Sequence, residues 1–152
     1  MMNNALVVYM DCCCLNRPTD DQTQDKIRIE TDAINGILFK CFYGSWKLIG
    51  SDIVEYEIMK TPDLNKINNV LNLYSVKKEN IELNNEIEAR ALEVQKHGLK
   101  PLDSLHFASA EYRNVDALLT VDKDFVKLSK KTNSFLRVEN PISWFMEAIE
   151  ND

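Results

Sequence analysis

Residues 5–11 have the sequence Ala-Leu-Val-Val-Tyr-Met-Asp, an unbroken apolar run that ends in a carboxylate. The run is too short for a membrane span or the core of a secretory signal, and its length suits a strand that is buried on both faces. Strands of this kind belong to parallel sheets that helices cover on either side. The stretch therefore predicts an α/β domain with an aspartate, Asp11, directly after its first strand.

The rest of the chain alternates between short apolar strands and longer helices. Further strands are expected at 46–49, 117–120 and 135–138, and residues 11–18 and 75–83 are expected to be irregular. Because Gly and Pro are few and no Ser- or Gly-rich linker occurs, we expect one domain over residues 1–152. The expected helices cover 23–41, 52–60, 63–74, 84–97, 102–113 and 123–131, and a last one begins at Pro141.

The charge balance limits the classes of function. The 18 basic and 24 acidic residues give a net charge of −6, which argues against a basic nucleic-acid coat protein or a polybasic membrane binder. It does not exclude an enzyme that handles nucleic acid through bound metal. No stretch is apolar enough to span a membrane, and the N-terminus lacks the features of a secretory signal. Since the consecutive Cys12, Cys13 and Cys14 also suit a reducing compartment, we expect a cytoplasmic protein.

Three aspartates occur where a parallel sheet would bring them together. Asp11 and Asp122 each follow an apolar strand, and the ligands of open parallel sheets bind at the carboxyl ends of their strands. Asp103 lies at the start of the helix expected at 102–113, which has an apolar face of small residues and is expected to be central. Each aspartate alone is more simply read as a helix cap or a turn residue, and the pair of strand-end aspartates is stronger evidence than either member.

Glu57 is a fourth acidic candidate. On a helix it shares an apolar stripe with Ile53, Val54 and Ile58, whereas Glu55 lies on the other side. A buried carboxylate is costly unless it is paired, hydrogen-bonded or bound to a metal. Four carboxylates at one crevice would repel one another unless cations bind there, and oxygen ligands suit one or two Mg²⁺ or Mn²⁺ ions. Such ions can activate water and hold the oxygens of a phosphodiester.

These motifs resemble those of the PIN-domain family, and they come in the family's order. The resemblance extends from Val7 to the helix after Pro141. Each fragment is weak alone, but four in order at suitable spacing form a strong signal. The four fragments are the apolar strand ending in Asp11, Ser51 with Glu57 six residues on, Leu102-Asp103-Ser104-Leu105-His106-Phe107-Ala108, and Leu118-Leu119-Thr120-Val121-Asp122-Lys123-Asp124-Phe125.

The resemblance implies a three-layer α/β/α sandwich with a central, mostly parallel sheet. It implies a Mg²⁺- or Mn²⁺-dependent endoribonuclease that acts on RNA, the toxin of a toxin–antitoxin pair, silenced by a small antitoxin protein and assembled as a homodimer. Cys12 and Cys13 depart from the hydroxyl and amide residues that the family commonly carries there, and a thiol is a weak donor. This departure motivates an alternative, a catalytically inactive PIN-fold module that binds and regulates a partner. The acidic cluster implied for catalysis and metal binding is Asp11, Glu57, Asp103 and Asp122.

Several further residues are candidates for supporting the site. Thr120 could hydrogen-bond to it, and Asp124 could be a fifth acid or a first-turn helix charge. His106 is either a base or a buried residue with satisfied hydrogen bonds. Arg17 and Lys123 could contact RNA phosphates, Lys123 within the segment 122–137, whose net charge is +3; a solvated helix face is the alternative for that segment.

Overall fold

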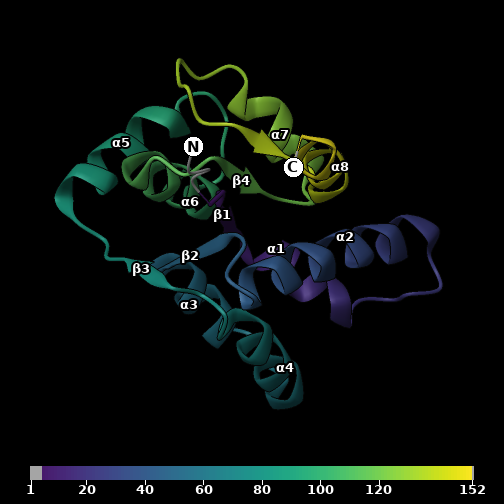
Figure 1. Ribbon diagram of the computed structural model, residues 1–152. Helices are drawn as coiled ribbons and strands as arrows, with labels where there is room; N and C mark the ends of the chain where they lie inside the picture. The colour runs from purple at the N-terminus through teal and green to yellow at the C-terminus, as the bar shows by residue number, and fades with distance from the viewer. Residues whose placement is uncertain (1–4, 152) are drawn as a thin grey trace.

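The computed structural model describes residues 5–151, and its centre is a parallel sheet with the strand order β3-β2-β1-β4-β5 (Figure 1). Strand β1 lies in the middle, where Val8 is in register with Leu48 of β2 and Ala117 of β4. This arrangement confirms the predicted α/β fold. The chain passes from β1 outward through β2 and β3 and then returns to the other side of β1, so the strand order reverses between β1 and β4. The strands are β1 (Val7–Met10), β2 (Lys47–Ser51), β3 (Glu79–Ile81), β4 (Ala117–Leu119) and β5 (Val138–Glu139).

Helices cover both faces of this sheet. Helix α2 packs on α8, and α5 packs on α6. Because crossovers between parallel strands are right-handed, the helices of opposite-running crossovers lie on opposite faces, as Figure 1 shows for these two pairs. Within residues 5–151 no helix is both long and apolar enough to cross a membrane. The helices are α1 (Cys12–Asn16), α2 (Asp25–Phe42), α3 (Asp52–Met59), α4 (Leu64–Tyr74), α5 (Asn85–Gln95), α6 (Pro101–Arg113), α7 (Lys123–Ser129) and α8 (Pro141–Glu150).

Three of the expected boundaries are wrong. Residues 11–18 were expected to be irregular but form α1 and a 3-10 helix, Arg17–Thr19, because the Asp11 side chain caps this helical turn. The expected irregular segment 75–83 contains β3, an edge strand of only three residues without an apolar run. The last strand begins later than the expected 135–138, at Val138, and Phe135 is exposed.

Close packing behind β2 fixes the position of its last residue. The Tyr74 hydroxyl accepts a hydrogen bond from the Ser51 backbone nitrogen at 3.0 Å. Gly50 makes this approach possible, because a Cβ there would lie 2.1 Å from the Tyr74 hydroxyl oxygen. Ser51 in turn caps α3, with its Oγ accepting from the Val54 nitrogen at 3.1 Å. The end of β2 and the start of α3 are therefore held in one place.

Candidate active site

Asp11 joins the end of the central strand to its neighbour. Its backbone nitrogen donates to the Leu119 carbonyl at 3.2 Å, and its Oδ1 accepts from the Cys14 nitrogen at 3.0 Å. The residue is only 2% exposed, and this burial is the main cause that raises the pKa of its carboxyl. His106 and the Thr120 hydroxyl act in the opposite direction on that pKa. Asp11 is thus both a helix cap and a buried acid at the carboxyl end of the central strand.

Thr120 connects Asp11 to the acid that follows the next strand. Its fully buried hydroxyl lowers the pKa of the Asp11 carboxyl and accepts a hydrogen bond from the Asp122 nitrogen at 3.1 Å. Asp122 is half-buried and caps α7, with its Oδ1 accepting from the Asp124 and Phe125 nitrogens at 2.9 and 3.3 Å. Asp124 itself is an exposed residue in the first turn of α7. The Thr120 hydroxyl therefore holds the Asp122 backbone after β4 and acts on the Asp11 carboxyl after β1.

Asp103 shows that the acids share one electrostatic environment. It lies in the first turn of α6, half-buried, and the pKa of its carboxyl is raised to about 6. Burial is the largest cause, followed by the negative charge of Asp11, with Asp122 and Glu57 adding to the rise. His106 lowers it. The four acids named from the sequence are therefore close enough to influence one carboxyl, although they come from separate segments of the chain.

Glu57 is held by a chain of buried polar groups. Its Oε1 contacts Nε2 of His106, which is fully buried. Nδ1 of the same ring lies 2.6 Å from the Tyr9 hydroxyl, and that hydroxyl lies 2.7 Å from Ser51 Oγ. The Glu57 side chain keeps 25% of its surface exposed, whereas Glu55 on the same helix points to solvent. The stripe predicted for α3 places Glu57 correctly on the inner side.

The donor chemistry of the site suits a hard divalent cation. All four acids offer oxygen ligands, and the pKa of Asp103 is raised first by burial and then by the negative charges of the other three acids. Within the described part of the chain, no three His, Cys, Asp or Glu side chains are arranged as a ready coordination group. The site therefore has the charge that a cation would neutralise, without a preformed set of three ligands.

The first helix after Asp11 carries neutral thiols. Cys12 and Cys14 are buried, Cys13 is exposed, and all three are free. Burial, reinforced by the charges of Glu57 and Asp11, raises the pKa of the Cys12 thiol to about 12, and its sulfur accepts from Asn16 Nδ2 at 3.1 Å. Where hydroxyl and amide residues are common in the family, this chain therefore has an uncharged thiol beside the acids.

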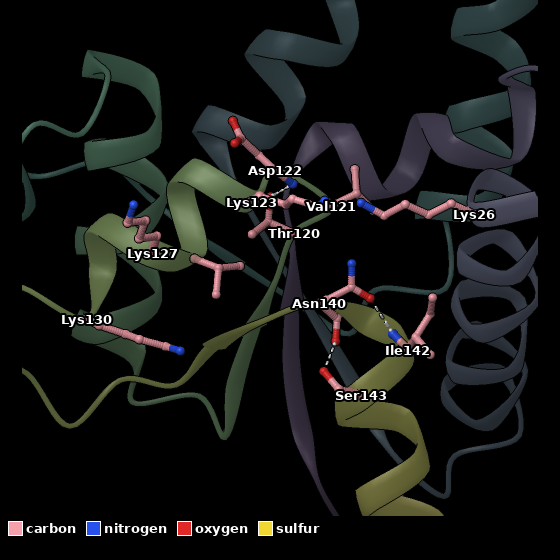
Figure 2. Close-up of a pocket in the computed structure, with 11 residues that line it drawn as sticks. Lys26, Thr120, Val121, Asp122, Lys123, Lys127, Lys130, Asn140, Ile142 and Ser143 are labelled. Atoms are coloured by element: carbon pink, nitrogen blue, oxygen red, sulfur yellow. Dashed lines mark hydrogen bonds between the residues drawn. The ribbon is translucent and has the colours of Figure 1, made fainter.

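The two basic candidates have different surroundings. Arg17 donates to Glu30 at 2.9 Å and to Asp20 at 3.1 Å, and the fully buried Glu30 also accepts from Asn140 Nδ2 at 2.6 Å. These bonds tie Arg17 into the fold between α2 and α8. Lys123, by contrast, is exposed and lines a pocket beside Asp122 (Figure 2).

Sequence reasoning missed the role of Tyr9. It was expected only as a core residue, yet its hydroxyl holds His106. A signal existed, because Tyr9 carries the only side-chain hydroxyl in the run 5–10 and a buried tyrosine hydroxyl needs a partner. The identity of that partner depends on how α6 packs on the sheet, which no local pattern reveals.

Comparison with known proteins supports this reading of the fold. The family model described as PIN domain matches residues 42–131, more than half of the chain. VapBC2 from Rickettsia felis, solved bound to a DNA fragment from their promoter, is similar with a TM-score of 0.59 and 16% identity, over 89% of this chain and 98% of that one. PAE2754 from Pyrobaculum aerophilum is similar with a TM-score of 0.59 and 13% identity, over 97% and 91%. No match was found among curated proteins. The two structures share the fold, and the family match shows that this chain belongs to the PIN-domain family.

Proposed function

We propose that this protein is a Mg²⁺- or Mn²⁺-dependent endoribonuclease and the toxin of a toxin–antitoxin pair. PIN domains are generally nucleases and generally use divalent metal ions. The observation that carries the proposal is that Asp11 and Asp122 follow the paired strands β1 and β4, where the strand order reverses, and that three acids add to the effect of burial on the pKa of Asp103. Such a cluster at the switch point of a parallel sheet is where a cation and a phosphodiester would meet. The three contributing acids are Asp11, Asp122 and Glu57.

The residues of the site divide into ligands and supports. A bound cation supplies Lewis acidity and an activated water, and one or two ions would be held by the four acids named below. The Cys14 nitrogen holds Oδ1 of Asp11, the Thr120 hydroxyl lowers the pKa of that carboxyl, and His106 orients Glu57. These supports matter because a coordination group works only when its oxygens are held in place. The four ligands are Asp11, Glu57, Asp103 and Asp122.

A protein partner is part of the proposal. The neighbour from Rickettsia felis is a toxin–antitoxin complex, and a small antitoxin is the corresponding partner here. The end of α2 exposes three large rings, Phe39, Phe42 and Tyr43, each more than 60% exposed. Exposed apolar patches of this kind are typical of surfaces that bind other proteins. Assembly as a homodimer is the second way to cover them, and mass measurement of the purified chain would distinguish a monomer from a dimer.

Cleavage of labelled single-stranded RNA in the presence of Mn²⁺ tests the proposal. Asp11→Asn and Asp103→Asn should abolish cleavage, and Asn at position 11 still offers an oxygen to cap α1, so the fold should survive. Glu57→Gln should also be inactive, whereas Glu55→Gln, a matched change on the exposed side of α3, should remain active. Full activity in Asp11→Asn or Asp103→Asn would overturn the assignment. A wild-type protein that neither cleaves RNA nor binds Mn²⁺ would favour the catalytically inactive module.

A further inference from the structure

The pocket beside Asp122 has the size and position of a substrate subsite. Its volume is about 470 Å³, within the range of small-molecule sites, and it lies between α7, the start of α8 and Lys26 of α2 (Figure 2). Asp122 belongs both to its wall and to the acidic cluster, and Thr120 in the same wall acts on the pKa of Asp11. The pocket therefore adjoins one acid of the cluster, Asp122, whose carboxylate points away from Asn140 and Ile142 (Figure 2).

Four lysines without ion-pair partners surround this pocket. All four are exposed, and none forms an ion pair with any residue in the range 5–151. Every arginine of the chain, in contrast, is paired with an acid. Other lysines of the described residues also lack ion pairs, Lys96 and Lys131 among them, but these four are brought together around one hollow. The four lysines are Lys26, Lys123, Lys127 and Lys130.

The inner surface of the pocket is apolar. Val121, Val126 and Ile142 contribute to it, and each is half-buried. The polar groups at its lower side are already engaged, since Asn140 Nδ2 donates to Glu30 and Ser143 Oγ donates to the Asn140 carbonyl at 3.2 Å. An occupant therefore meets an apolar floor and a cationic rim. A nucleotide has this combination, with a flat base for the floor and a phosphate for the lysines.

We propose that this pocket binds one nucleotide of single-stranded RNA, next to the phosphodiester that lies at the carboxylates. The base packs against Val126 and Ile142, and the flanking phosphates are bound by Lys127 and Lys130, with Lys26 closing the far side. The inference rests on the proposed function, because it places the substrate strand relative to the acidic cluster. A run of glutamates would satisfy the lysines but has no flat ring for the floor.

Binding can be measured separately from cleavage. The probe is a short fluorescein-labelled oligouridine, and the protein is the full chain carrying Asp103→Asn, in EDTA, with affinity read from anisotropy. Adding Lys127→Gln and Lys130→Gln should weaken binding about tenfold, since each removes an exposed phosphate contact. The slope of log affinity against log salt should become shallower by about 1.4, at roughly 0.7 per contact with a single strand. The matched control adds Lys96→Gln and Lys131→Gln, two exposed lysines outside the pocket, and should change affinity less than twofold.

Three outcomes of the binding measurements would overturn the proposal that the pocket binds a nucleotide. Equal losses in the two double-lysine variants would mean general electrostatic attraction. Equal binding of an oligouridine and of an abasic strand of the same length would show that the base makes no contact with the apolar floor. Lysine-dependent binding of oligoglutamate as tight as that of oligouridine would assign the pocket to an acidic peptide.

The result also separates the pocket from the nuclease activity. A wild-type protein that fails to cleave RNA but binds oligouridine through Lys127 and Lys130 would retain the pocket and overturn the proposed function. A protein that cleaves RNA with the same KM after both lysines are changed would retain the nuclease and overturn the pocket.

Discussion

The imidazole Nδ1 of His106 lies 2.6 Å from the Tyr9 hydroxyl, so a residue of the central strand determines the orientation of a ring on α6. The other ring nitrogen contacts Glu57, and the Tyr9 hydroxyl also bonds to Ser51 Oγ, which caps α3. Three elements that meet only in the folded protein thus control one carboxylate. A substitution of Tyr9 in the core should therefore alter how the Glu57 carboxylate is held at the site.

Tyr9→Phe tests this control. It leaves the His106 nitrogen and the Ser51 hydroxyl with one partner fewer, at a cost of about 1–3 kcal/mol in the free energy of unfolding. Because Glu57 then loses its fixed support, kcat for RNA cleavage should fall on the order of tenfold while KM changes little. Tyr74→Phe is the control, since it removes a buried hydroxyl bonded to the Ser51 backbone but not the contact to His106. Full turnover in Tyr9→Phe would show that Glu57 does not depend on the ring.

Asp103→Asn should stabilise the metal-free protein at neutral pH. The folded pKa of about 6 lies above the ordinary value of 3.8, so the folded state pays for ionising this carboxyl at pH 7. Asparagine removes that penalty, and we expect a gain on the order of 1–2 kcal/mol after allowance for solvent screening. The gain should shrink as the pH falls below 6 and vanish below the unfolded pKa. Urea unfolding in EDTA at several pH values measures it, and a variant less stable than wild type at pH 7 would contradict the electrostatic account.

Cation binding should be visible at Cys13. Although Cys13 is exposed at the surface, desolvation of its sulfur by neighbouring atoms, followed by the charges of Asp11 and Glu57, raises the pKa of this thiol to about 12, so the thiol is almost entirely neutral at pH 8. Mn²⁺ at the acids would cancel part of the negative charge, and iodoacetamide should then modify Cys13 several-fold faster. Cys41 is the control, because burial alone raises the pKa of its thiol to about 12. Peptide mass spectrometry gives both rates, and an equal acceleration at the two cysteines would exclude a local cation.

Arg17→Gln distinguishes a structural arginine from one that contacts RNA. Its loss leaves the buried Glu30 without its cation, which should destabilise the fold by about 3 kcal/mol or more. Adding Glu30→Gln should restore part of the stability, because the uncompensated charge is then gone. Thermal unfolding of the single and double variants measures both effects. A single variant of normal stability but weakened RNA binding would instead support the phosphate contact suggested by the sequence.

The features that could be predicted from the sequence are those that depend on local patterns of apolar and polar residues. Apolar runs and helical spacing were sufficient for the parallel sheet and for Glu57 on the inner side of α3. Helix α1 was missed because three cysteines carry no helical signal, and it forms through the single cap at Asp11. The Tyr9–His106 contact and the approach of Lys26 to the pocket were missed for another reason, since both depend on the packing of distant elements.

The capping roles of Asp11 and Asp122 constrain how the family's chemistry can be lost in this chain. Each acid starts a helix through its Oδ1, so the same atom serves folding whether or not catalysis is under selection. A descendant freed from nuclease activity could drop either negative charge by a change to Asn, but a change to Ala would unsettle α1 or α7 by about 1 kcal/mol. An oxygen-bearing side chain at these positions in a relative is therefore weak evidence of activity. The charge on Asp103, which caps no helix, is the more informative mark of a working enzyme.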